Sequence, residues 1–190
     1  EEIEKMTDVL AWSCSKEDEY KSLTIQDYNW AAPCNKDLPH PVKMCLQRTV
    51  DRVYQAMESF IHNCNNIHSR GGNQVVFSSI NYGTDTSPEG RLIIKELLKS
   101  TYEGVGKGST AIFPIHVFKC KSGVNKNEGD PNYDLYKQSW KVAARRFFPN
   151  YLNLDSSFNK DENRDVNDPL RYIHEVATMG CRTRIYDNLF

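Results

Sequence analysis

Short apolar runs alternate with longer amphipathic segments along most of this chain, and this alternation limits its fold more than any other feature. Runs typical of β-strands lie at about 74–82, 110–119 and 151–154, and segments with helical spacing lie at about 42–68, 88–102 and 130–147. Strands that alternate with helices of this length indicate βα units and a mainly parallel sheet. The sequence therefore predicts a single α/β unit, with too few strands to close a barrel alone.

The predicted helices have recognisable ends and faces. The glycine-containing loop at 69–73 ends the first helix with a left-handed cap. Ser87 and Pro88 suit the N-cap and the first position of the second helix, and Thr86 with Glu89 has capping-box spacing. We expect these side chains of the second and third helices to face inward: Leu92, Ile93, Leu97 and Leu98, then Leu135, Trp140, Ala143, Ala144 and Phe147.

Prolines and a charged run mark the interruptions. Pro114 lies within the second predicted strand, and because proline cannot donate to a ladder we expect a bulge or a sheet edge there. Asp130–Pro131 opens the third helix and Pro149 closes it. The charged, asparagine-rich stretch at 155–171 is predicted to be an exposed loop.

Composition excludes several classes of function. The 190 residues suit one domain, of which 1–41 is a poorly assigned N-terminal segment and 42–190 is the α/β part. Lys and Arg number 24 against 25 for Asp and Glu, which argues against direct nucleic-acid binding and against an anionic membrane as a partner. No apolar run approaches the ~20 residues of a membrane span, and the acidic start lacks the pattern of a secretion signal. We expect a cytoplasmic protein.

The six cysteines are scattered, and no CxxC pair or HExxH motif is present. A structural zinc site or a disulfide framework is therefore not expected, and no metal site is assigned. Five of the six cysteines are best explained as packing residues. Cys64 falls on an apolar helical stripe and Cys120 ends an apolar strand.

Cys181 differs from the other five because it lies between Gly180 and Arg182. Glycine permits a sharp turn, and a neighbouring arginine favours a thiolate or an anion. Those residues predict a reactive thiol at a turn. The alternative is a small buried hydrophobe, since free cysteine is among the most buried residue types.

Three other segments carry possible ligand chemistry. Residues 104–109 (GVGKGS) are not a phosphate loop, because Gly108 separates the lysine from the serine, so we expect a helix-ending turn. The loop of Ser69, Arg70, Gly71, Gly72, Asn73 and Gln74 either lets the backbone approach a ligand or is a flexible connector. The helix start at 86–91 either holds a phosphate or is capped in the ordinary way.

Four motifs occur in order along the chain: NQVVFSSINYGTDTSPEGR at 73–91, IFP at 112–114, GDPNYDL at 129–135 and MGCRTR at 179–184. Together they resemble the anaerobic, class III, glycyl-radical ribonucleoside-triphosphate reductases over about residues 49–184. The resemblance implies that this chain supplies part of a ten-stranded α/β barrel. It also implies a finger loop near 176–186 that carries Cys181 at its tip, supported by Gly180 and Arg182.

The family's chemistry follows from the same resemblance. Cys181 would become a thiyl radical by transfer from a glycyl radical on a region outside this chain, and would take the 3′ hydrogen from a ribonucleoside triphosphate. A radical-SAM iron–sulfur enzyme would generate the glycyl radical, and formate or a thiol system would serve as reductant. The loop at 69–74 would respond to a bound dNTP or ATP effector in a homodimer.

Several parts of the family pattern are missing, so the chain is expected to be inactive alone. The glycyl-radical motif and the adjacent zinc site would lie in an absent C-terminal region, and a partner cysteine cannot be assigned to Cys14 or Cys34. The alternative to a catalytic segment is a nucleotide-binding or dimerisation module derived from the family. In that module the helix at 42–68 would contact a second subunit.

Overall fold

The computed structural model describes residues 40–67, 74–159, 175–180 and 183–185. The N-terminal segment up to residue 39 and most of the predicted loop at 155–171 lie outside the described residues. The described elements follow in this order: α3 (His40–Asn66), β1 (Ser79–Tyr82), α4 (Pro88–Glu103), β2 (Ile115–Cys120), α5 (Tyr133–Arg146), β3 (Asn150–Asn153), β4 (Ala177–Met179) and β5 (Thr183–Ile185).

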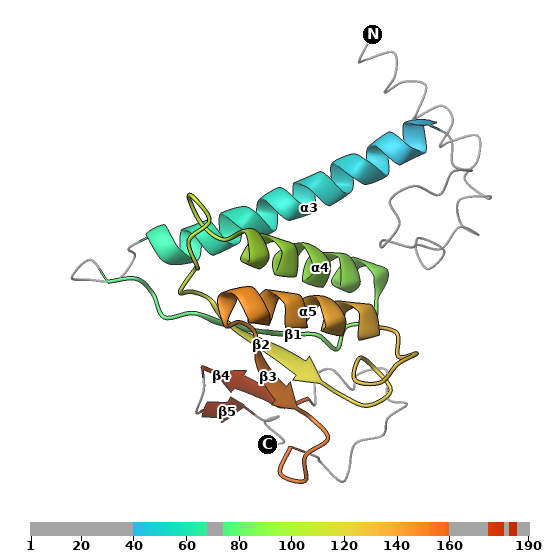
Figure 1. Ribbon diagram of the computed structural model, residues 1–190, viewed down its shortest axis with the longest axis vertical. Helices are drawn as coiled ribbons and strands as arrows, with labels where there is room; N and C mark the ends of the chain where they lie inside the picture. Colours follow the sequence, from blue (N-terminus) through green and yellow to red (C-terminus); the bar gives the residue numbers. More distant parts are fainter. Residues whose placement is uncertain (1–39, 68–73, 160–174, 181–182, 186–190) are drawn as a thin grey trace, which may run out of the picture.

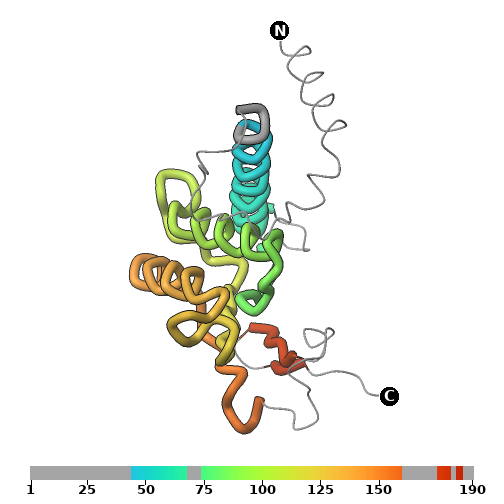
Figure 2. Tube along the Cα trace, turned by 90° about the vertical axis from the view of Figure 1, so that its right-hand side faces the viewer, coloured from blue at the N-terminus to red at the C-terminus, as the bar shows by residue number. Residues whose placement is uncertain are grey.

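Strands β1, β2 and β3 form one parallel sheet in that spatial order, with Asn81 opposite Val117 and Val117 opposite Asn150. Helices α4 and α5 connect successive strands, which confirms the predicted α/β class. The three helices lie to one side of this sheet, and the short antiparallel pair β4–β5 lies to the other (Figures 1 and 2). Strands β1, β2 and β3 form an open sheet.

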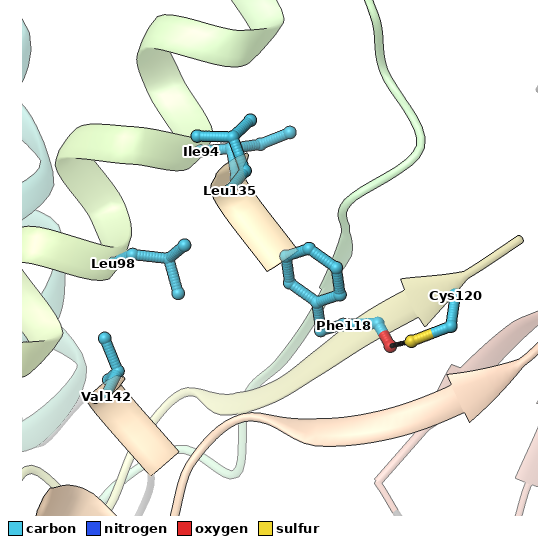
Figure 3. Packing of buried hydrophobic residues seen from close by; sticks show 6 residues of the cluster. All are labelled: Ile94, Leu98, Phe118, Cys120, Leu135 and Val142. Atoms are coloured by element: carbon cyan, nitrogen blue, oxygen red, sulfur yellow. Dashed lines mark hydrogen bonds between the residues drawn. The ribbon is translucent and has the colours of Figure 1, made fainter. Parts of the chain in front are cut away.

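Alternating side chains bury both faces of this sheet, because successive residues of a strand point to opposite sides. On the helix side, the core consists of Ile94, Leu98, Phe118, Cys120, Leu135 and Val142 (Figure 3). On the opposite side, Val117, Leu152 and Leu154 pack with Val176, the residue that precedes β4. The residue that leads into the hairpin therefore belongs to the folded core of the described part, whereas β5 is exposed.

The predicted strands begin too early in two places. Pairing in β1 starts at Ser79 rather than at residue 74, and pairing in β2 starts at Ile115, just after Pro114. The predicted bulge or edge at Pro114 is wrong. Proline is excluded from the ladder by its missing N–H, so the central strand of the sheet simply begins one residue later.

The faces of the helices were predicted only in part. In α4, Ile94 is 3% exposed whereas Ile93, an expected inward residue, is 46% exposed. In α5, Leu135 is buried as expected, but Trp140 is 44% and Phe147 is 88% exposed. The other inward residues of α5 are Ser139, Val142 and Arg146. The helix begins at Tyr133 rather than at Asp130, and Ala144 is exposed while Ala143 is half-buried.

Arg146 is buried because it serves as a hydrogen-bond donor to the end of α4. Its guanidinium donates to the carbonyl oxygens of Tyr102 at 2.8 Å, Glu103 at 2.7 Å and Gly108 at 2.8 Å. Helices end with unpaired carbonyl groups that need such donors. The Gly104 amide closes the same turn on the Ser100 carbonyl, so the segment at 104–109 is the helix-ending turn that the sequence predicted.

Arg146→Leu is expected to destabilise this chain by about 3 kcal/mol, because three carbonyl groups lose a charged donor within a buried site. Arg145→Leu is the matched control, since the neighbouring Arg145 is exposed and contacts only the face of Tyr102 among the interactions described, at 4.4 Å. That control should cost less than about 1 kcal/mol. Urea unfolding of both variants measures the difference, and equal losses would contradict this role for Arg146.

Candidate functional site

The β4–β5 hairpin carries the cysteine that the sequence singled out. Met179 pairs with Thr183, so only Gly180, Cys181 and Arg182 connect the two strands. Cys181 and Arg182 lie outside the described residues, while Gly180 is buried with a φ of +62°. This left-handed conformation favours glycine, as expected for a sharp turn beside Cys181.

Gly180 rests directly on the segment that leads into β1. A side-chain Cβ at this position would lie 3.3 Å from Cζ of the Phe77 ring. The Gly180 amide also donates to Ser79 Oγ at 3.3 Å. The backbone conformation therefore favours glycine immediately before Cys181, and a Cβ there would also require the Phe77 ring to shift by a few tenths of an ångström.

Asn81 binds the backbone of β4, the first strand of the hairpin, with one donor and one acceptor, as a neighbouring strand would. Its Nδ2 donates to the Thr178 carbonyl at 2.7 Å, and its Oδ1 accepts from the Thr178 amide at 2.9 Å. Phe77, Ser79 and Asn81 alternate along one face, so the three contacts to the hairpin come from the same side of this segment. The carboxamide fixes the position of β4 along β1.

A buried carboxylate holds the entry to the hairpin. Glu175 accepts from Thr84 Oγ1 at 2.7 Å and forms ion pairs with Lys119 Nζ at 3.5 Å and Lys121 Nζ at 3.2 Å. Its side chain is only 5% exposed. Because one buried carboxylate contacts the ammonium groups of both lysines and the Thr84 hydroxyl, the cluster favours one position for the entry of the chain into β4.

A cleft of about 240 Å³ lies beside this cluster, at the carboxyl end of β1. Its polar lining includes Asn81, Thr84, Asp85 and Lys119. Ligands of parallel α/β sheets commonly bind at the carboxyl ends of the strands. The arrangement places hydrogen-bond donors and an ammonium group next to the hairpin stem.

Side chains of the chain itself already form the hydrogen bonds at the start of α4. Ser87 Oγ accepts from the Gly90 amide at 3.1 Å, and Asp85 Oδ1 accepts from the Ser87 amide at 2.8 Å. Arg91 binds the Asp134 carboxylate at 2.8 Å. Ordinary capping by Ser87 is therefore confirmed. The capping box predicted from Thr86 is wrong, because Ser87 is the N-cap residue.

The other predicted site residues are described only in part. Ser69, Arg70, Gly71, Gly72 and Asn73 lie outside the described residues, and Gln74 is exposed three residues before Phe77. The loop is thus continuous with the segment that supports Gly180.

The remaining described cysteines lie away from the hairpin. Cys120 is buried on the helix side of the sheet, Cys64 is half-buried in α3, and Cys45 is exposed. Burial raises the pKa of the Cys120 thiol, as expected for a packing residue. Within residues 40–67, 74–159, 175–180 and 183–185, no group of three His, Cys, Asp or Glu side chains could hold a metal ion.

Comparison with known proteins decides the family. The family model described as "Anaerobic ribonucleoside-triphosphate reductase" matches residues 10–188. The chain belongs to the anaerobic ribonucleoside-triphosphate reductase family. No helix among the described residues is long and apolar enough to cross a membrane.

Several curated relatives carry the same name. The anaerobic ribonucleoside-triphosphate reductase of Escherichia coli K12 is 38% identical over 120 residues, which are 63% of this chain and 17% of that protein. The protein of Salmonella typhimurium LT2 is 38% identical over 62% of this chain and 17% of its own length. The protein of Enterobacteria phage T4 is 33% identical over 72% of this chain and 21% of its own length. The chain therefore matches about a fifth or less of each of these reductases.

The supporting residues of this reductase segment were not predicted from its sequence. Phe77 lies 103 residues before Gly180, and Asn81 lies 97 residues before Thr178, so nothing local connects them with the hairpin. Glu175 is near the hairpin in sequence, but its partners Thr84, Lys119 and Lys121 are distant. One signal was present. Lys119 is a charged residue within a strand of mostly apolar residues, at a position whose side chain faces away from the helices, and a lysine buried there needs a polar partner on that face.

Asn81→Ala is expected to increase amide exchange at Thr178 by about tenfold or more, because both of its hydrogen bonds to the backbone of this residue are lost. Asn81→Asp is the matched variant, since it keeps an acceptor for the Thr178 amide but cannot donate to the Thr178 carbonyl. Its exchange rate should be intermediate. Native-state hydrogen exchange resolves the three proteins, and an unchanged rate in Asn81→Ala would contradict the proposed attachment.

Proposed function

We propose that this chain is the finger-loop portion of a longer anaerobic reductase that converts ribonucleoside triphosphates to deoxyribonucleotides by thiyl-radical chemistry. The observation that carries the proposal is the β4–β5 hairpin, which is attached to the face of the sheet opposite the helices and has Cys181 in the middle of its three-residue connection. Membership of the reductase family supports the same reaction class.

The sheet face that carries the hairpin would be the inside of a ten-stranded α/β barrel. Two features of the described part support this: the helices cover only one face, and the opposite face is organised around the hairpin. Residues 42–190 would form part of the barrel, with the finger loop near 176–186. The remaining strands would come from other regions of the longer polypeptide.

Cys181 would carry out the hydrogen transfer. Its thiyl sulfur would take the 3′ hydrogen atom of the substrate ribose, which forms an S–H bond and leaves a carbon-centred radical on the sugar. The 2′-hydroxyl would take up a proton and leave as water, and formate or a thiol system would supply two electrons and the proton balance. The Cys181 S–H would then return its hydrogen atom to C3′, which regenerates the thiyl radical. A glycyl radical on another region of the longer reductase would supply the oxidising equivalent that the sulfur needs. A radical-SAM iron–sulfur enzyme would generate it, and zinc would belong only to that outside region.

The residues around the hairpin would hold this sulfur in place. Gly180 keeps the turn narrow, and Asn81 and Glu175 fix the stem on the sheet. Correct placement matters, because a displacement of about 1 Å at a reacting group can cost about a hundredfold in rate. Arg182 would complete the turn, and the loop at 69–74 would communicate the presence of a nucleotide effector within a homodimer.

Cys181→Ala in the complete reductase is expected to abolish deoxyribonucleotide formation while the glycyl radical still forms, because only the hydrogen-transferring sulfur is removed. Cys45→Ala is the control, since that thiol is exposed on α3. Product formation and the electron paramagnetic resonance signal of the glycyl radical should be measured on the same samples. Residual turnover in Cys181→Ala would refute the assignment.

A further inference from the structure

A groove of about 630 Å³ lies between α4 and α5, in the helical layer that covers one face of the sheet (Figures 1 and 2). Its lining includes Lys99 and Tyr102 from α4 and Lys141, Ala144 and Arg145 from α5. Gln138, which also lines the groove, donates through its Nε2 to the Lys95 carbonyl at 3.2 Å and so joins the two helices. The hairpin lies on the opposite face of the sheet, so the groove is separate from the site described above.

Among the described residues that line the groove, every charged side chain is cationic. Lys141 and Arg145 are both exposed and lie one turn apart on α5. The Arg145 guanidinium lies 4.4 Å from the centre of the Tyr102 ring, and no described carboxylate forms an ion pair with Lys141 or Arg145. Like charges at this spacing slightly destabilise a helix. The pair therefore opposes folding and is available to bind an external anion.

Two carboxylates of α4 interact with α3 instead of compensating these charges. Glu96 is buried and lies 3.8 Å from Lys99 Nζ, which is itself 4.5 Å from the centre of the Tyr54 ring in α3. Burial, followed by the charges of Glu58, Glu103 and Glu96, raises the pKa of Tyr54. Lys99 is thus partly compensated from the α3 side, and the positive charge of the groove comes mainly from α5.

The cations extend over a length that suits a linear anion. Lys137 is also exposed and precedes Lys141 by one turn, so this row, which ends at Arg145, spans about 12 Å along the axis of α5. Carboxylates one turn apart on a helix, or at alternate residues of an extended chain, have a similar spacing of about 5–7 Å. Tyr102 and Ala144 add apolar surface for uncharged side chains of the same segment. The near balance of charge over the whole chain disfavours nucleic acid.

We propose that the groove between α4 and α5 binds an acidic segment of a partner protein. Carboxylates of that segment form ion pairs with Lys141 and Arg145 and with the exposed ammonium group of Lys99, while an apolar side chain packs against Tyr102 and Ala144. Charge complementarity of this kind acts mainly on the rate and specificity of association. Because exposed charges are screened by salt, the complex is reversible and sensitive to ionic strength.

Binding of a fluorescent acidic peptide to the complete reductase tests this site. The probe has about 15 residues, with glutamates one helical turn apart and a leucine near its centre, and the control probe has glutamine at the same positions. We expect the acidic probe to bind at least about tenfold more tightly than the control probe at low salt. Lys141→Glu/Arg145→Glu should weaken binding of the acidic probe by about tenfold or more, and a probe with lysines in place of glutamates should prefer this variant to the wild type.

Arg48→Glu/Arg52→Glu is the matched control, because both arginines are exposed, lie one turn apart on α3 and undergo the same change of charge. It should bind the acidic probe as the wild type does. Equal loss in the two double variants would show general attraction to the charge of the protein and would overturn the proposal. Equal binding of the acidic and glutamine probes to the wild type would overturn it as well. Lys141→Gln/Arg145→Gln decides alone if the glutamate variant at these positions fails to fold.

Other occupants of the groove give different results. A single-stranded oligothymidylate that binds more tightly than the acidic probe, and that is lost in Lys141→Glu/Arg145→Glu, would identify nucleic acid and overturn the assignment to a protein segment. Failure of every probe to bind would mean that another region of the reductase covers the groove, which also overturns it. None of these results bears on Cys181, and an active Cys181→Ala enzyme would remove the proposed function without affecting this inference.

Discussion

The attachment of the hairpin to β1 depends on one carboxamide. Asn81 offers a donor and an acceptor to Thr178, so a single side chain satisfies the backbone of β4 in the way that a paired strand would. The backbone of β1 cannot do this, because its N–H and C=O groups lie in the plane of the sheet whereas the hairpin lies on the sheet face (Figure 2). A hairpin lying across a sheet face therefore needs side-chain partners for its buried N–H and C=O groups.

The two faces of the sheet use different physical means to hold their neighbours. The helix side is an apolar and aromatic core in which Phe118 packs against residues of α4 and α5 (Figure 3). The side that faces the hairpin combines a small apolar cluster around Val117 with the buried Glu175–lysine contacts. Apolar contacts are non-directional, whereas ion pairs and hydrogen bonds require particular positions. The polar contacts thus give the hairpin a defined location that hydrophobic burial alone would not provide.

The general architecture could be predicted from the sequence because it depends on local patterns. Helical spacing, the Ser87–Pro88 start and the glycine cluster after Glu103 all act within a few residues, and each was confirmed. Strand starts and helix faces were less accurate, since they depend on distant partners. Trp140 was expected to face inward because it is hydrophobic, but it is exposed. Arg146 is instead among the inward residues of α5, and its hydrogen-bond acceptors lie at the end of α4 and just after it. The contacts of Asn81 and Glu175 also join residues that are far apart in the sequence, so a local pattern could not reveal them.

The attachment of the hairpin at three residues has a consequence for the spacing of residues along the chain. Glu175 is fixed at the entry to β4, Thr178 is fixed in its middle and Gly180 is fixed at its end. An insertion or deletion of one residue between Glu175 and Gly180 would break at least one of these attachments. It would also reverse the facing of every later side chain, since neighbouring strand residues point to opposite sides. Natural variants of this segment should therefore differ in residue type and keep its length.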